Sequence, residues 1–307
     1  MTKRVVLMGH PVAHSLSGAM QQAAFDAKGL DVRYELWDRS PIALGAAIRE
    51  LKGDDFLGAN VTIPHKERVV PLMDRLTEDA AATGAVNTIT KEGRRLVGHN
   101  TDVAGFAVAL DKLVGRQKMP RAAVVLGAGG GARAIVHGLI RAGFLRVIVF
   151  NRHLHRAEAL VRHFSKSAAH MELKAMPWHE SIIESELLRT KILINATSIG
   201  LTSDTSPVPA EILPQSLLVL DLIYADTRFL REAKKQGCTT ADGQTMLLNQ
   251  GAAAFTLWTG LPAPLEVMAD ALTAARAGGL RSAEGEITGA EGDAASSDAT
   301  PGTAPAA

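Results

Sequence analysis

Short apolar runs rich in β-branched residues recur along the first 90 residues, and segments with helical spacing of apolar positions separate them. Four runs predict β-strands, at residues 4–10, 32–38, 57–63 and 85–90. Helical patterns begin near Ser17 and at Ser40, which we expect to be an N-cap because Pro41 follows it as the first helical residue. This alternation predicts a mostly parallel sheet covered by helices.

A second series of strands follows after residue 121. It comprises residues 122–128, 146–152, 191–197 and 217–224. Each is a nearly continuous apolar run, as expected for strands with both faces buried in a parallel sheet. Between the two series, residues 101–114 have apolar residues at helical spacing, with Thr101 or Asp102 as N-cap. We predict a connecting helix there.

Two further helices are predicted after residue 237, at residues 245–260 and 264–278. The last segment, residues 281–307, is poor in large apolar residues and rich in Ala, Gly, Ser and Pro. Such a segment buries too little surface to offset its ordering entropy, so we predict that it is disordered.

Composition excludes several classes of protein. The chain has 307 residues, of which 47% are hydrophobic, and this is enough for about two domains. A net charge of +1 and an aromatic content of 4% argue against a nucleic-acid partner. No long uninterrupted apolar stretch predicts a membrane span or a secretion signal. The single cysteine, Cys238, fits a reducing, cytoplasmic location.

A glycine-rich motif lies where the first strand of the second series meets a helix. Gly127, Gly129 and Ala132 have the spacing G-x-G-x-x-A. In this strand–turn–helix context, the glycines permit a tight turn and the close approach of a pyrophosphate. Amides at the helix N-terminus then bind the phosphates. The candidate cofactor-binding residues here are Gly127, Ala128, Gly129, Gly130, Gly131 and Ala132.

The end of the next strand indicates which dinucleotide is preferred. NAD sites usually carry an acid there, about 20 residues after the motif, to bind the ribose 2′-hydroxyl. This chain instead has Asn151 and Arg152, with Arg156 one turn later. Guanidinium groups suit a 2′-phosphate, so we predict NADP(H). The alternative is that Arg156 and Arg162 merely belong to a solvated helix face. That interpretation is adequate for Arg162, but it accounts less well for Arg152.

Three histidines follow the same strand, at His153, His155 and His163. They have no cysteine or carboxylate partner at a spacing typical of metal ligands. We therefore expect exposed histidines and no metal site.

Residues 58–67 raise a question about Lys66. The apolar run before Ile63 predicts a strand, and Pro64 is well placed to open a helix. Lys66 would then lie in the first helical turn, where the helix dipole disfavours a cation. Such a lysine is either irrelevant to the fold or required for chemistry.

Five polar clusters lie beside predicted strand ends or helix starts. They are residues 14–17, 60–66, 84–88, 98–102 and 241–255. Taken in order, they resemble the shikimate dehydrogenase family over residues 4 to 277. That family reduces 3-dehydroshikimate with NADPH on the way to chorismate and aromatic amino acids.

The resemblance implies an α/β fold of two domains. Residues 1–102 together with 238–280 would form the substrate domain. Residues 103–237 would form a Rossmann-like, doubly wound NADP domain. The active site would lie between the two, where hydride can pass from nicotinamide to substrate.

The resemblance also assigns catalytic roles. Lys66 matches the family's catalytic lysine and Asp102 its carboxylate partner. A positioned ammonium can protonate the carbonyl oxygen during reduction and recover the proton in the reverse direction. The alternative is an ordinary surface lysine and a simple helix cap, although one carboxylate can cap a helix and serve catalysis together.

Other roles are likewise implied by the resemblance. Ser15 and Ser17 match the pair that binds the substrate carboxylate, while an N-cap is the alternative for Ser17 alone. The full set of implied substrate contacts is Ser15, Ser17, Thr62, Asn87, Tyr224 and Gln250. The implied further cofactor contacts are Glu78, Asn151, Arg152, His153, Arg156, Leu222 and Gly243. Asn60 and Asn100 are expected to hold loops.

The chain departs from the family pattern at two places. Gly18 and Gln21–Gln22 replace the usual Pro and His-Asn, which should alter local stability and leave substrate binding intact. His153 replaces a Thr or Ser that contacts the 2′-phosphate, so the preference for NADP should be less strict.

Two other functions stay open at this point. One is a quinate/shikimate dehydrogenase with relaxed cofactor use, although its relatives tend to carry threonine in place of one of the two serines. The other is a non-catalytic NADPH-binding regulator, which would be expected to lose Lys66 or Asp102. The sequence does not decide between a monomer and a homodimer.

Overall fold

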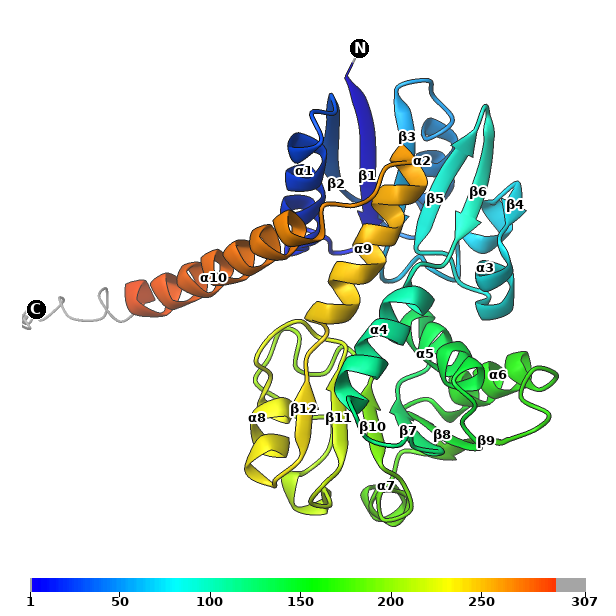
Figure 1. Cartoon of the computed structure of the whole chain (residues 1–307), viewed down its shortest axis with the longest axis vertical. Coiled ribbons are helices and arrows are strands. Elements are labelled where there is room, and N and C mark those ends of the chain that lie inside the picture. The colour runs from blue at the N-terminus through cyan, green and yellow to red at the C-terminus, as the bar shows by residue number, and fades with distance from the viewer. Residues whose placement is uncertain (1, 291–307) are drawn as a thin grey trace, which may run out of the picture.

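Two six-stranded sheets organise the chain, one in each half of the molecule (Figure 1). The computed structural model describes residues 2–290. In the first sheet the strand order is β2-β1-β3-β5-β6-β4. Its strands are β1 (Lys3–Gly9), β2 (Val32–Asp38), β3 (Phe56–Val61), β4 (Arg75–Leu76), β5 (Thr88–Glu92) and β6 (Arg95–His99).

The first sheet is mixed, and this corrects the mostly parallel sheet that we expected in this half. Strand β5 runs antiparallel to both β3 and β6. We did not predict β6, which follows β5 after a two-residue turn at Gly93, where φ is +64°. A two-residue turn can only join antiparallel strands, so the missed strand determines the direction of the pairing.

Helices from both ends of the chain cover this sheet. They are α1 (Ser17–Ala27), α2 (Leu44–Glu50), α3 (Glu78–Thr83), α9 (Gln244–Thr259) and α10 (Leu265–Ala290), with the short 3₁₀ segment η1 (Val70–Leu72). Helix α9 returns from the second half and packs against α1, where the rings of Phe25 and Phe255 lie 5.3 Å apart. The C-terminal helices therefore complete the core of the N-terminal half (Figure 1).

Two predicted helix starts are wrong. Helix α2 begins at Leu44, because Pro41 starts a turn in which the Ala43 amide donates to the Ser40 carbonyl at 3.0 Å. No α-helix begins at Pro64 either, since residues 66–69 form turns. The Lys66 carbonyl accepts a hydrogen bond from the distant Val86 amide at 2.8 Å instead of propagating a helix. The dipole argument for Lys66 therefore does not apply.

The second sheet is parallel throughout, with the order β12-β11-β10-β7-β8-β9. Its strands are β7 (Ala122–Leu126), β8 (Arg146–Asn151), β9 (Glu172–Pro177), β10 (Ile192–Asn195), β11 (Leu218–Asp221) and β12 (Thr239–Ala241). Counted from β7, this is the order of a doubly wound dinucleotide-binding fold, with its crossover point between β7 and β10. The sequence did not predict the two edge strands, β9 and β12, because neither is a continuous apolar run.

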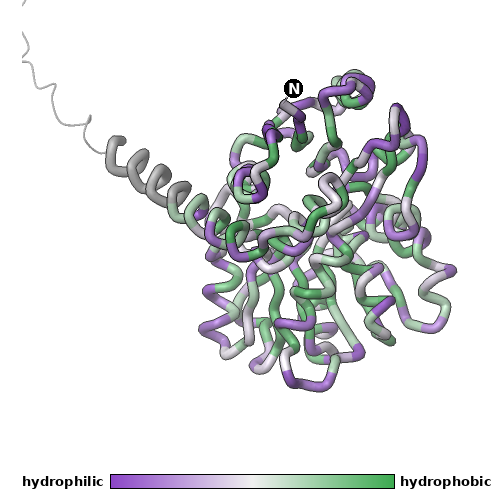
Figure 2. The backbone as a smooth tube through the Cα atoms, turned by 45° about the horizontal axis from the view of Figure 1, so that its top comes forward, coloured by the Kyte–Doolittle hydropathy of each residue, from purple (hydrophilic) through white to green (hydrophobic). Residues whose placement is uncertain are grey.

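Helices lie on both faces of the second sheet. They are α4 (Asp102–Val114), α5 (Gly130–Arg141), α6 (Leu154–Phe164), α7 (Glu180–Leu187) and α8 (Arg228–Lys235), with the 3₁₀ segment η2 (Ala210–Ile212). The four central strands are almost entirely buried, and Figure 2 shows hydrophobic residues concentrated along them. Helix α4 confirms the predicted connecting helix. Among the described residues, no helix combines the length and apolar character needed to cross a membrane.

The segment predicted to be disordered, residues 281–307, begins within helix α10. Helix α10 continues to Ala290. Extending an existing helix adds one backbone hydrogen bond per residue without a new nucleus, and this segment contains the good helix formers Ala, Arg and Glu. Residues 291–307 lie outside the described residues.

A buried carboxylate ends strand β11. Asp221 accepts hydrogen bonds from the Thr227 hydroxyl at 2.8 Å, the Asn195 side-chain amide at 3.0 Å and the Ile223 amide at 3.1 Å. Burial nevertheless raises the pKa of Asp221 to about 6, from an ordinary value of 3.8. The folded protein therefore binds a proton here more readily than the unfolded chain does.

The variant Asp221→Asn tests this effect on stability. Because the pKa is raised on folding, ionised Asp221 reduces stability above pH 6, and this cost disappears as the pH falls towards 4. Asparagine does not ionise, so the free energy of unfolding of the variant minus that of the wild type should rise by up to about 3 kcal/mol between about pH 4 and about pH 7. Urea unfolding measures this difference, and a difference independent of pH would contradict the prediction.

Candidate active site

The topology of the first sheet brings three loops to one edge. Asn60, Thr88 and His99 pair side by side across β3, β5 and β6. Since β5 runs opposite to its two neighbours, its beginning lies beside their ends. Lys66 follows β3, Asn87 precedes β5 and Asp102 follows β6, so all three residues lie at this edge.

Lys66 and Asp102 form a close ion pair at this edge. The Lys66 ammonium donates to one Asp102 carboxylate oxygen at 2.6 Å, and their side chains are only 17% and 6% exposed. The side-chain amide of Asn87 donates to the other carboxylate oxygen at 2.9 Å. A carboxylate held at both oxygens orients the ammonium, which remains partly exposed.

A polar network extends this pair to the C-terminal helix α9. The Asn87 side-chain amide also donates to the Gln250 side-chain oxygen at 3.2 Å. The Thr101 backbone amide donates to the Asn87 side-chain oxygen at 2.7 Å. The Thr101 hydroxyl bonds Asn87 rather than capping α4. Residues from four distant segments thus converge on one small polar site.

The glycine motif has the geometry of a phosphate-binding turn. Gly127 has φ of +107°, and a Cβ there would lie 2.8 Å from the Ala196 carbonyl oxygen. A Cβ on Gly129 would meet no atom within 4 Å, so the backbone of this residue faces open space. Helix α5 starts at Gly130 and its first amides lack partners within the helix. The turn therefore fits a pyrophosphate.

The same turn abuts the lysine of the other half. A Cβ on Gly130 would lie 2.7 Å from the Lys66 Cβ, so only a glycine leaves room for this side chain. On the other side of the turn, the Leu222 side chain packs 3.5 Å from a Cβ position on Gly131. A Cβ on Gly243 would collide with the Leu222 carbonyl. The structure therefore brings together Lys66, the glycine motif, and Leu222 and Gly243, the two residues expected beside the nicotinamide.

The end of β8 carries exposed positive charge. Arg152 is exposed and, within the described part of the chain, has no carboxylate within ion-pair distance. Arg156 is also exposed and lies 3.9 Å from Glu67. The Asn151 side chain donates to the His153 carbonyl at 2.9 Å and so shapes the turn before α6.

The two serines lie at the start of α1. Ser15 is half-buried, and its hydroxyl accepts from the Ser17 amide at 3.3 Å. Ser17 is the first residue of the helix, after Leu16 at the N-cap position, so the N-cap alternative is wrong. One turn later, the Gln21 side chain donates to the Gly251 carbonyl at 2.9 Å, next to Gln250. Ser17, one turn before Gln21, is thus on the side of α1 that faces α9.

Four remaining candidates have varied surroundings. Thr62 is half-buried at the end of β3, beside Gly9. Tyr224 is half-buried and its burial raises its pKa. Asn60 is buried and donates to the Thr88 hydroxyl at 3.0 Å. Glu78 is exposed at the start of α3.

Sequence reasoning missed the contacts that join the two halves beside the site. Arg133, directly after the glycine motif, donates to Glu67 at 3.0 Å and to the Thr83 carbonyl at 3.0 Å. Asp79 accepts from Arg141 at 3.0 Å. The position of Arg133 after the motif was visible in the sequence, but nothing in the sequence indicated its partner.

The predicted surface histidines divide into two groups. His153 and His155 are exposed and their rings lie 5.8 Å apart. His163 is exposed as well, but its Nε2 lies 2.8 Å from the Ala82 carbonyl oxygen across the junction of the two halves. Among residues 2–290, no group of three or more His, Cys, Asp or Glu side chains is arranged to hold a metal.

Comparison with known families and proteins shows which of them this chain is similar to. Residues 7–89 match the model of the shikimate dehydrogenase substrate binding domain. Residues 110–202 match that of shikimate/quinate 5-dehydrogenase, and residues 243–273 match the shikimate 5′-dehydrogenase C-terminal domain. A shikimate dehydrogenase (NADP⁺) from Symbiobacterium thermophilum is 40% identical over 277 residues, which is 89% of this chain and 94% of the relative. The chain belongs to the shikimate dehydrogenase family.

Solved structures of the family share the whole fold. Shikimate 5-dehydrogenase from Thermus thermophilus, in complex with NADP(H) and shikimate, is 40% identical and has a TM-score of 0.78, over 89% of this chain and 99% of that one. Quinate dehydrogenase from Corynebacterium glutamicum, in complex with NAD, is 28% identical with a TM-score of 0.80, over 89% and 99%. The predicted two-part α/β fold with a Rossmann-like half is thus confirmed.

The contact between Gly130 and Lys66 can be tested by adding one methyl group. Gly130→Ala places a Cβ 2.7 Å from the Lys66 Cβ, so the lysine must shift away from its present position. Turnover at saturating cofactor should fall by about 10- to 100-fold.

Gly131→Ala is the matched control, because its Cβ would make only an ordinary contact at 3.5 Å with Leu222. Steady-state kinetics of both variants, with thermal unfolding to check the fold, make the comparison. Equal turnover in the two variants would refute the steric role of Gly130.

Proposed function

We propose that this chain catalyses the reversible, NADP(H)-dependent reduction of 3-dehydroshikimate to shikimate, a step towards chorismate and the aromatic amino acids. The observation that carries the proposal is the buried pair of Lys66 and Asp102 at the edge of the first sheet, directly against the phosphate-binding turn at Gly130. Membership of the shikimate dehydrogenase family supports it.

The second half supplies the cofactor site. The turn at residues 127–132 and the first amides of α5 would hold the pyrophosphate. Arg152 and Arg156, with Asn151 and His153 shaping the turn, would bind the 2′-phosphate. Leu222 and Gly243 lie beside the turn on the nicotinamide side. When bound, the cofactor donates or accepts a hydride at the substrate carbon.

Lys66 performs the proton transfer. In the direction of reduction, its ammonium donates a proton to the carbonyl oxygen, and in the direction of oxidation the amine removes the hydroxyl proton. Asp102 holds the ammonium in place through a charge-assisted hydrogen bond of 2.6 Å. Because Asn87 binds the second carboxylate oxygen, Asp102 keeps one geometry while the proton moves. Their partial burial strengthens each of these interactions.

The remaining polar groups position the substrate. Ser15 and Ser17, at the start of α1, would bind its carboxylate through hydroxyls and backbone amides. Asn87 and Gln250 each offer a donor and an acceptor to the ring hydroxyls. Thr62 and Tyr224 are further contacts, and Glu78 is a minor contact to the cofactor. We place the boundary between the two domains at residues 102 and 238, with Asp102 at the junction.

A quinate/shikimate dehydrogenase is the second candidate. The NAD-bound quinate dehydrogenase from Corynebacterium glutamicum has the same fold, so fold alone does not separate the two activities. Both serines of the S-x-S pair are present, and Arg152 favours NADP. A catalytically silent regulator is disfavoured because Lys66 and Asp102 are both present and paired. We propose a cytoplasmic location, as the single Cys238 indicates.

One assay distinguishes these candidates. Reduction of NADP⁺ is followed by nicotinamide absorbance with shikimate and then with quinate, and both are repeated with NAD⁺. We expect turnover with shikimate and NADP⁺ to exceed the other three combinations. Faster turnover with quinate would support the second candidate, and no turnover with either acid would support the regulator.

Replacement of the proposed proton donor tests the mechanism. Lys66→Ala should lower kcat by about 10²- to 10⁴-fold, the usual effect of losing an acid/base group. The KM for NADP⁺ should change little, because all the proposed cofactor contacts except the minor one of Glu78 come from the other half. Lys52→Ala is the control, since Lys52 forms a surface ion pair with Asp74 at 3.1 Å. Unchanged turnover in Lys66→Ala would remove this lysine from the mechanism.

Replacement of Arg152 tests the choice of cofactor. Arg152→Ala should raise the KM for NADPH by about 10- to 100-fold, because a charge-assisted hydrogen bond to the 2′-phosphate is lost. The KM for NADH, which lacks that phosphate, should stay within a few-fold of the wild type. Arg162→Ala, which removes an exposed charge from α6, is the control. Equal weakening of both cofactors would refute the assigned contact.

A further inference from the structure

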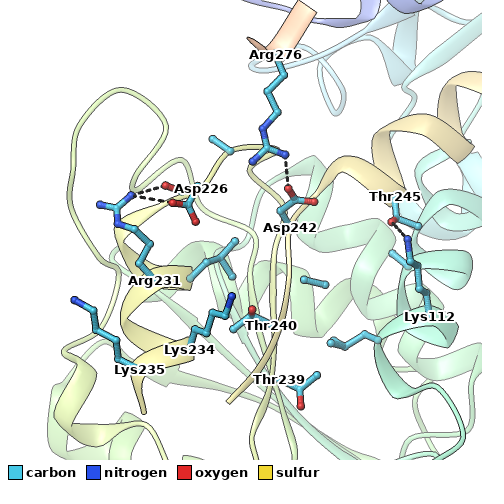
Figure 3. Close-up of a pocket in the computed structure, with 15 residues that line it drawn as sticks. Lys112, Asp226, Arg231, Lys234, Lys235, Thr239, Thr240, Asp242, Thr245 and Arg276 are labelled. Atoms are coloured by element: carbon cyan, nitrogen blue, oxygen red, sulfur yellow. Dashed lines mark hydrogen bonds and ion pairs between the residues drawn. The ribbon is translucent and has the colours of Figure 1, made fainter. Parts of the chain in front are cut away.

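A second concave site lies at the far edge of the parallel sheet, outside the proposed active site. It is a groove of about 870 Å³ over the edge strand β12 (Figure 3). Helix α4 packs on one face of this sheet and α8 on the other, so the groove wraps around the edge between them. Its volume falls in the range of small-molecule sites, about 300–1,000 Å³.

The groove is positively charged. Its lining holds five cations, namely Lys112, Arg231, Lys234, Lys235 and Arg276, and two carboxylates, Asp226 and Asp242 (Figure 3). Acids already balance both arginines. Arg231 contacts Asp204 at 2.5 Å and Asp226 at 3.7 Å, while Arg276 contacts Asp242 at 2.7 Å.

The three lysines account for the excess charge. Among the described residues, none of Lys112, Lys234 and Lys235 has a carboxylate within ion-pair distance, and Lys112 only donates to the Thr245 hydroxyl at 3.4 Å. The last turn of α8 favours cations at Lys234 and Lys235 through the helix dipole. The same effect acts on Lys112, which lies in the last turn of α4 on the other side of β12.

The rest of the lining suits an organic anion. Leu113 and Leu230 are buried beneath the groove and provide an apolar floor. Thr239 and Thr240 contribute hydroxyls from β12. As the edge strand of its sheet, β12 pairs only with β11, so backbone groups on its outer side are also available as hydrogen-bond partners. Ammonium groups act as point charges that bind phosphate well.

We propose that this groove binds a small organic phosphate monoester, with the phosphate held by Lys112, Lys234 and Lys235 and the organic part on the apolar floor. The proposal goes beyond the proposed function and does not rest on it. The lining of the groove includes none of the proposed cofactor or substrate residues, although Ala225 and Asp242 adjoin Tyr224 and Gly243 in the sequence.

Calorimetry with phenyl phosphate on the full chain tests the proposal. NADP⁺ is kept at saturation so that it occupies the arginines after β8. We expect saturable binding of one phenyl phosphate in the wild type. In Lys234→Ala/Lys235→Ala the affinity should fall by about 10- to 100-fold, because two charge-assisted contacts are lost. Lys234→Arg/Lys235→Arg should retain most of it.

Lys28→Ala/Lys166→Ala is the matched control, because it removes two exposed lysines and the same charge from distant surfaces. This variant should bind phenyl phosphate as the wild type does. Lys112→Gln, on the other helix, should also weaken binding, and it gives an independent result if the α8 variant does not fold. Absence of saturable binding, or equal affinity in the groove variants and the control, would overturn the proposal.

Discussion

The buried pair of Lys66 and Asp102 is the interaction on which the site and the junction of the two halves both depend. Removing an ammonium and a carboxylate from water is costly, so the pair persists only where further hydrogen bonds compensate. Asn87 supplies one such bond, at 2.9 Å to the second carboxylate oxygen. Asn87 is itself held by the Thr101 amide at 2.7 Å. These bonds hold the proposed proton-transfer group in one geometry.

One member of this pair, Asp102, also lies where the chain passes from the first sheet to the second. Asp102 is the first residue of α4, the helix that leads from one sheet to the other. Helix α4 packs closely against α9, and a Cβ on Gly105 would lie 2.6 Å from the Met246 carbonyl oxygen. The outgoing and returning segments of the chain thus lie against each other.

The carboxyl ends of the parallel strands and the edge strand β12 carry different side chains and backbone groups. At the carboxyl ends of the strands, the glycine motif faces open space at Gly129 and forms the proposed dinucleotide site. At the edge strand β12, side chains of α4 and α8 instead form a basic groove. Leu222 contacts the glycine motif while Ala225 and Asp226 line the groove, so one short segment borders both regions.

The amino-acid sequence by itself determined the central strands of the second sheet and the glycine motif. Continuous apolar runs can be satisfied only by burial on both faces, and the motif needs only local backbone freedom. The pattern of hydrophobic residues was insufficient to predict β6, β9 and β12. These are short strands, edge strands or hairpin strands that are stabilised by their neighbours. The sequence pattern also predicted a false helix at Pro64, where a hydrogen bond from distant Val86 prevails over local preference.

The roles of Lys66 and Asp102 were inferred from family resemblance, since their spacing of 36 residues indicates no contact by itself. Only the tertiary structure decided that they meet. An antiparallel strand between two parallel ones places three loops at one sheet edge, and Gln250 arrives there from the other end of the chain. The contacts of Arg133 with Glu67 and the lysine groove were likewise invisible in the sequence. Such long-range contacts depend on how whole layers pack, which no local pattern of residues encodes.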